Sequence, residues 1–198
     1  MSRPRSLTDA TVLDRAVGVF WRHGYADASL RDLTRATGLS AAALYHRFGD
    51  KDGLFAASLE HYADEGLTAR LADLAADADP LAAISRFFAE IVALSTDDPD
   101  RLGCFLVNSV LDGGAMSAQA RALAWARLSE VEAFFRERLA ALRLRGGGLE
   151  PLDPVAMAEN LLAIVLAIRV FARLAPDRAR LERLADSALA PLRHAALA

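Results

Sequence analysis

The chain has 198 residues, of which 54% are hydrophobic and 25% are charged, and its net charge is −3. This balance is that of a globular protein and excludes a chain that is disordered throughout. The net charge argues against a protein that coats nucleic acid regardless of sequence, because such binding relies on a strongly cationic surface.

The cysteine content and the apolar runs indicate a soluble protein. The single cysteine, Cys104, cannot form an internal disulfide, so we expect a reducing compartment, the cytoplasm. The N-terminal residues lack the apolar core of a secretory signal. The longest apolar run, residues 161–168, is closed by Arg169 and is shorter than the ~20 residues that span a bilayer. We therefore expect no membrane partner.

The abundance of Ala, Leu and Arg and the scarcity of β-branched residues predict an all-α fold of about nine helices. Thr8 or Asp9 is expected to cap the first helix, which should run to about His23 and end at Gly24. Ser29, with Asp32 three residues later, should open a short second helix that ends at Thr37.

A helix-turn-helix follows from the residues around Gly38. Gly38 supplies the left-handed turn, Leu39 fills the corner, and Ser40 can cap a third helix that reaches Phe48. Two helices joined by a turn of about three residues that contains Gly form the helix-turn-helix unit.

A longer helical part should follow. Its first helix is expected to run from Lys51 to about Ala76 as a connector. Further helices are expected from Pro80, over residues 102–111 and 117–145, from Pro154 after a loop at 146–148, and from Pro176, the last interrupted at Pro191. We expect a DNA-binding domain at residues 1–50 and a helical domain for ligand binding and dimerisation at residues 51–198.

The first 55 residues resemble the N-terminal DNA-binding domain of the TetR family of transcriptional regulators. The resemblance rests on these residues and their spacing: Phe20, Gly24, Ser29, Leu30, Leu33, Gly38, Leu39, Ser40, Leu44, Tyr45, Phe48, Lys51, Leu54 and Phe55. It implies a dimeric regulator that places the third helix in the major groove of double-stranded operator DNA. It also implies release, as from a repressor, when a small-molecule effector occupies the C-terminal domain.

The resemblance also assigns DNA contacts. It places Tyr45 and Lys51 against phosphates, Ser29 and Arg31 against the backbone, and Ala41, Ala42, Ala43 and His46 toward base edges; Ser40 and Arg47 complete the candidate DNA-binding residues. Small side chains suit a helix whose backbone approaches base edges closely, and alanine methyl groups can pack against thymine methyl groups.

Two basic features of the N-terminal part stay open. Arg47 stands where the family usually has His, and it could pair with a guanine, bind phosphate or only cover the helix surface. Arg3 and Arg5 precede the first cap and could form an arm that touches the minor groove or be disordered.

The C-terminal part suits an apolar or aromatic effector better than a highly charged one. Asn108 on an apolar stripe must be hydrogen-bonded if it is buried, either to a neighbouring backbone group or to an effector. Glu159, Asn160 and Arg169 interrupt an otherwise apolar helix and could orient a ligand, pair across an interface or lie at the surface. The candidate ligand-binding residues are Phe87, Phe88, Cys104, Phe105, Asn108, Trp125 and Asn160.

Cys104 supports an alternative function. It lies in a Gly-Cys-x-x-x-Asn stretch that resembles one found in several TetR-like regulators. A thiol near a pocket can be oxidised or alkylated, which would make the chain a redox- or electrophile-sensing repressor. A buried, inert thiol explains the residue as well.

The remaining expectations concern assembly and catalysis. The last two helices have wide apolar faces, which include Leu161, Val165 and Ile168, and pairing with a second copy would make a four-helix bundle. An all-helical enzyme is the other class considered. The sequence has no phosphate loop, nucleophile elbow or His-Glu-x-x-His motif, so we expect neither catalysis nor a cofactor.

Overall fold

The computed structural model describes residues 7–112, 116–145 and 153–196. These residues form helices and no strand, which confirms the all-α prediction. The elements are α1 (Asp9–Asp27), α2 (Leu30–Thr37), α3 (Ala41–Phe48), α4 (Lys51–Tyr62), η1 (Ala63–Thr68), α5 (Ala69–Ala75), α6 (Pro80–Thr96), α7 (Phe105–Leu111), α8 (Ala118–Leu144), α9 (Pro154–Leu174) and α10 (Arg178–Ala196). The expected arm at Arg3 and Arg5 and the expected loop at 146–148 lie outside the described residues.

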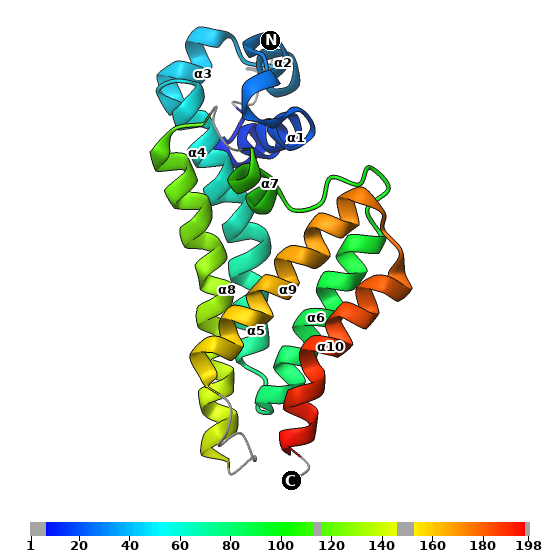
Figure 1. The fold of residues 1–198 in the computed structure, drawn as a ribbon. Helices are drawn as coiled ribbons and strands as arrows, with labels where there is room; N and C mark the ends of the chain where they lie inside the picture. The colour runs from blue at the N-terminus through cyan, green and yellow to red at the C-terminus, as the bar shows by residue number, and fades with distance from the viewer. Residues whose placement is uncertain (1–6, 113–115, 146–152, 197–198) are drawn as a thin grey trace.

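Helices α1, α2 and α3 lie together at one end of the molecule (Figure 1). From there α4 leads away beside α8, and α6, α9 and α10 form the rest of a bundle (Figure 1). The segments α4, η1 and α5 follow one another without a break, so the described residues form nine helical rods, the number that the sequence predicts.

The predicted helix starts are confirmed by their caps. The backbone N–H of Asp32 donates to Ser29 Oγ at 3.1 Å, and that of Ala43 donates to Ser40 Oγ at 3.2 Å. Each cap satisfies a donor that the first turn of a helix leaves free. Gly24 has φ 73° and ψ 173°, outside the helical region, so the regular part of α1 ends where predicted.

The core extends across the expected domain boundary. Phe20 from α1 and Phe55 from α4 are buried in one cluster with Phe105 from α7 and with small residues of α8. A second cluster fills the bundle between α6, α8, α9 and α10. The N-terminal unit therefore shares its core with α7 and α8 as well as with the connector.

One segment of the connector has a geometry that the sequence pattern does not predict. Residues Ala63–Thr68 form a π-helix inside the rod. Such wide turns occur as local bulges in α-helices, frequently at functional sites. This π-helix borders a cavity in the bundle, described below, through Gly66 and Leu67.

Helix α9 is long and apolar enough to cross a membrane by composition, the only such helix among the described residues. Seven of its residues, Arg169 among them, are buried against the rest of the bundle. A helix in the core of a bundle is apolar for this reason, so its composition reflects packing.

Candidate DNA interface and effector cavity

Gly38 sets the corner between α2 and α3. Its φ of 73° and ψ of 12° lie in the left-handed region, which L-residues other than glycine adopt at a cost. Arg15 Nη1 donates to the carbonyl oxygen of Thr37 at 3.2 Å, and Thr37 Oγ1 donates to the carbonyl oxygen of Leu33 at 2.7 Å. The corner is thus tied to α1 and to the preceding turn, which fixes the direction in which α3 leaves.

The outer edge of α3 is built from small side chains. Leu44 is fully buried against the N-terminal core, while Ala42 and His46 on other faces are exposed. Ala41 and Ala43 are half-buried. The edge that the sequence assigns to base contacts is therefore low in relief and carries one imidazole.

Tyr45 and Lys51 flank this edge. Tyr45 is half-buried and packs against the N-terminal core. Lys51 Nζ donates to the carbonyl oxygen of Ala26 at 3.3 Å and lies 4.6 Å from the ring centroid of Tyr25. The ring and the carbonyl hold the ammonium group at the start of α4, beside the C-terminal end of α3.

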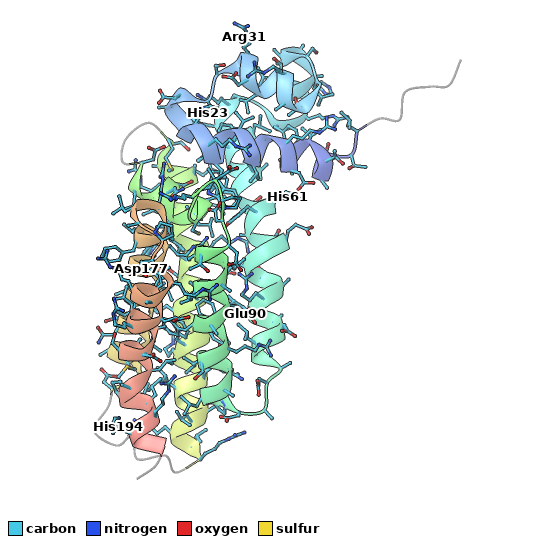
Figure 2. The ribbon with its side chains drawn as sticks, turned by 90° about the vertical axis from the view of Figure 1, so that its right-hand side faces the viewer. His23, Arg31, His61, Glu90, Asp177 and His194 are labelled. Carbon is cyan, nitrogen blue, oxygen red and sulfur yellow. The ribbon has the colours of Figure 1, made fainter. Side chains whose placement is uncertain are left out.

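The start of α2 presents the other candidate contacts. Ser29 Oγ donates to Asp32 Oδ2 at 2.5 Å, and this hydrogen bond, the largest cause, lowers the pKa of the half-buried Asp32. Arg31 is exposed, and it projects from the end of the molecule opposite His194 (Figure 2). Ser29 thus has a capping role beside any contact with DNA.

Arg47 does not extend from the edge of α3. Its Nη1 donates to the carbonyl oxygen of Leu7 at 3.1 Å and pairs with Asp9 Oδ1 at 3.2 Å. Of the three alternatives that the sequence leaves open, this contact favours the third, in which Arg47 covers the helix surface and ties α3 to the start of α1.

Gly53 is a structural residue of this interface that the sequence analysis missed. A Cβ atom at Gly53 would lie 1.9 Å from the carbonyl oxygen of Phe48, the last residue of α3. Only glycine allows α4 to start so close to the end of α3. Its signal in the sequence is a glycine in the first turn of a helix, where stronger helix formers are the rule.

A cavity of about 420 Å³ lies in the bundle below this unit. Its lining is mainly apolar, and polar groups enter it from Tyr62 in α4, Cys104 before α7, Arg70 in α5 and Arg169 in α9. A volume of this size accommodates a small organic molecule. The principal apolar residues are Phe87, Ile91, Leu106, Val107, Val131 and Val165.

Trp21 joins the cavity to the helix-turn-helix unit. Its ring lines the cavity from α1, and its Nε1 donates to the carbonyl oxygen of Leu102 at 3.0 Å. The ring also meets Tyr62 edge-on, with centroids 5.0 Å apart. A single side chain of the first helix therefore contacts both the cavity and the loop before α7.

The candidate ligand-binding residues are divided between different places. Phe87 and Cys104 line the cavity. Phe105 and Asn108 line a smaller hollow beside Gly24, and Phe88 is buried against α8 and lines a groove beside α10.

Asn108 is hydrogen-bonded to a neighbouring backbone group, the first of the two alternatives, because its Nδ2 donates to the carbonyl oxygen of Leu102 at 2.7 Å. Two further candidates lie away from the cavity. Trp125 is 48% exposed on α8, and Asn160 is exposed on α9. Residue type made them candidates, but both lie on exposed faces of their helices. Of the three polar residues that interrupt α9, only Arg169 is buried.

No group of three or more His, Cys, Asp or Glu side chains that could hold a metal ion occurs in the described part of the chain. Cys104 is half-buried and precedes α7, and its Sγ accepts a hydrogen bond from the Tyr62 hydroxyl at 3.9 Å. Burial is the largest cause of a raised pKa at Tyr62, so this phenol stays protonated.

The capped helix-turn-helix with its rigid corner defines a DNA-binding regulator whose second part is a helical bundle with a cavity. Residues 12–58 match the model of the bacterial regulatory proteins of the tetR family. The chain is 31% identical over 192 residues to the HTH-type transcriptional repressor ComR of Escherichia coli, an alignment that covers 96% of this chain and 90% of ComR. The chain belongs to the tetR family of transcriptional regulators.

Two further comparisons show how much of the chain is similar to known regulators. Over 46 residues, 23% of this chain and 24% of the relative, the chain is 48% identical to the HTH-type transcriptional repressor AcnR of Corynebacterium glutamicum. A solved structure of the tetR-family regulator CifR, a cysteine mutant bound to a 26-base-pair operator, superposes with a TM-score of 0.84 at 32% identity. That match covers 94% of this chain and 98% of CifR, so the likeness includes the bundle.

Proposed function

We propose that this protein is a cytoplasmic repressor that binds a near-palindromic operator as a homodimer and is released by a small, mainly apolar effector. The observation that carries this proposal is the position of Trp21, which lines the cavity and belongs to the first helix of the DNA-binding unit. A molecule that enters the cavity must contact or displace a side chain on which the helix-turn-helix unit rests.

The proposed DNA contacts follow from the geometry of α3 and its flanks. Ala41, Ala42, Ala43 and His46 face base edges in the major groove, and the cap residue Ser40 approaches the backbone. Tyr45 and Lys51 bind phosphates on either side. The start of α2, with Ser29 and Arg31, contacts the backbone across the groove.

Release follows from a shift between two states. Effector binding favours the arrangement in which α1 and α4 are displaced, and this changes the separation of the two recognition helices in the dimer. Two half-sites lie one helical turn apart on DNA, so both helices must keep this spacing to bind together.

The proposed dimer uses the outer face of α9. Much of the apolar surface expected to lie free, including Leu161, Val165 and Ile168, is covered within the chain's own core. Besides Val155 and Glu159, the exposed residues of the first half of α9 are Ala156, Asn160 and Ala163. Small side chains let two helices approach closely, and in such a pair Asn160 would face the second copy.

The first test measures operator binding by fluorescence anisotropy with DNA from upstream of the protein's own gene. We expect Lys51→Ala to weaken binding and to reduce the salt slope by about one, because one phosphate contact is lost. Tyr45→Phe should weaken binding with an unchanged salt slope. Arg143→Ala, an exposed arginine at the far end of α8, is the matched control and should leave both unchanged.

The proposed function is wrong if the wild-type protein does not bind these DNA fragments in buffer of low salt concentration. It also fails if Lys51→Ala has the affinity and the salt slope of the wild type. The alternative repressor that senses oxidants or electrophiles through Cys104 is not favoured by the comparisons, which match the chain to the family as a whole.

A further inference from the structure

Within the described residues, the charge of Arg169 has no ionic partner. Its side chain is 7% exposed and lies on α9 between Ile168 and Val170. Its Nη1 donates to Ser95 Oγ at 2.9 Å and its Nη2 donates to the carbonyl oxygen of Gly103, both neutral acceptors. In the described part of the chain, no carboxylate lies within ion-pair distance of this guanidinium.

The neighbouring charged residues of the cavity are engaged elsewhere. Arg70, the other arginine of the lining, pairs with Glu90 at 3.1 Å. Asp97 pairs with Arg178 at 3.2 Å. Asp98 accepts the backbone N–H groups of Asp100 and Gly103. Among the lining residues that the structure describes, Arg169 is thus a cation with no carboxylate within ion-pair distance.

A buried, uncompensated charge destabilises a fold, and buried charges are for this reason normally paired. The hydrogen bonds to Ser95 and Gly103 offset part of this cost, as does the C-terminal end of α6 beside Ser95. They leave a positive charge without an ion pair at the wall of a mainly apolar space. That charge attracts an anionic ligand. The ligand must lose its water to enter the cavity, and this costs least for a molecule with a single carboxylate on an apolar body.

A second donor lies on the same wall. The Tyr62 hydroxyl also borders the cavity, and the acceptor that it contacts in the structure is the Cys104 sulfur at 3.9 Å. A thiol sulfur is a weak acceptor, so a better acceptor would replace it. A guanidinium and a neutral phenol together form the donor set that binds one oxyanion.

We propose that the effector is an amphipathic monoanion whose carboxylate, or similar oxyanion, pairs with Arg169 and accepts a hydrogen bond from Tyr62, while its apolar body fills the cavity. This inference rests on the proposed function and names the chemical class of the effector.

The same arginine connects the effector to the DNA-binding unit. Gly103, whose carbonyl oxygen accepts from Arg169, follows Leu102, whose carbonyl oxygen accepts from Trp21 and Asn108. A carboxylate that draws Arg169 away from Gly103 loosens the loop to which Trp21 is tied. Binding of the anionic head therefore reaches α1 through Gly103, Leu102 and Trp21.

The test uses Trp21 as the reporter. The chain has two tryptophans, so Trp125→Phe, a change at a half-exposed position, leaves Trp21 as the single emitter. This protein is titrated with 4-phenylbutyrate and with 4-phenylbutanamide, which share size and shape but differ in charge. We expect the acid to bind at least about ten-fold more tightly, because a charge-assisted hydrogen bond is worth that factor or more.

Variants assign the preference to residues. Arg169→Met should abolish the acid preference, Arg169→Lys should keep it in part, and Tyr62→Phe should reduce acid affinity a few-fold. Arg70→Met is the matched control and should keep the preference, since that arginine is already paired. If circular dichroism shows that Arg169→Met does not fold, the comparison of the acid with the amide and the Tyr62→Phe variant still test the preference for an anionic ligand.

Three results would overturn the inference: equal or tighter binding of the amide, an acid preference that survives in folded Arg169→Met, or no binding of the acid. Operator binding is measured on the same samples. If the neutral amide releases the protein from the operator, the effector needs no anionic group, so the inference is wrong while the proposed function is still supported. A protein that binds no operator fragment would instead contradict the proposed function.

Discussion

Gly53→Ala tests whether the close junction of α3 and α4 positions the recognition helix. The added Cβ atom would lie 1.9 Å from the carbonyl oxygen of Phe48, whereas real Cβ contacts are essentially never under 3.0 Å. The end of α3 and the start of α4 must therefore separate by more than 1 Å, and the contacted atom belongs to the backbone, so no side chain can rotate away.

The expected cost follows from this geometry. Overpacking of this kind destabilises by about 1–3 kcal/mol, and the helix preference of alanine over glycine returns up to about 1 kcal/mol. For a chain of this length each kcal/mol corresponds to a shift of about 2–4 °C in Tm. We expect Gly53→Ala to lower Tm by several degrees and to weaken operator binding about ten-fold or more at temperatures where it is folded, because misplacement of α3 loses several contacts together.

Thermal melts by circular dichroism and operator anisotropy measure the two effects. Gly18→Ala is the matched control, since its Cβ would meet only Arg22 Nη1 at an ordinary 3.6 Å, and it should match or exceed the wild type in Tm. A Gly53→Ala protein with wild-type Tm and wild-type operator affinity would refute the argument that this junction sets the direction of α3.

Three further predictions concern coupling, titration and assembly. Trp21→Phe keeps an aromatic side chain but loses the hydrogen bond to Leu102. In anisotropy assays this variant should bind operator normally and respond less to any compound that releases the wild type. Ser29→Ala should raise the pKa of Asp32 toward 3.8 in an NMR titration. Because the pKa of Asp32 is depressed in the folded state, the stability that the Asp32 carboxylate contributes is present at neutral pH and is lost as the pH falls through this pKa. Ala163→Glu should convert a dimer to monomers in sedimentation velocity, while Ala126→Glu on α8 should not.

Local features of the fold were predictable because their cause lies within a few residues. Ser29 and Ser40 cap helices through their own third neighbours, and Gly38 turns the chain through its own dihedral angles. The same holds for Asp79 and Asp153, each followed by a proline at the start of its helix. The helix-turn-helix could therefore be placed to within a residue or two.

The cavity could not be predicted in the same way, because it depends on which helix faces another. Trp125 and Asn160 have the residue types of a binding site, but their faces of α8 and α9 lie at the surface. Arg169 lies nine residues beyond Asn160 on the same helix and is buried. Periodicity gives the relative angle of two residues on a helix, whereas the covered side is fixed by the packing of distant segments.

The aromatic contacts around Trp21 explain how a cavity in the bundle can control a helix at its end. Rings of α1, α4 and α7 meet edge-on: Trp21 and Tyr62 at 5.0 Å, and Phe55 and Phe105 at 5.7 Å between centroids. Close-packed rings do not deform gradually, because each has neighbours on every side. We therefore expect a ligand that needs volume at the wall of Trp21 and Tyr62 to move α1 and α4 together. The C-terminal end of α3 is tied to both helices, to α1 through the Arg47–Asp9 pair and to α4 through the close junction at Gly53, so we expect α3 to move with them.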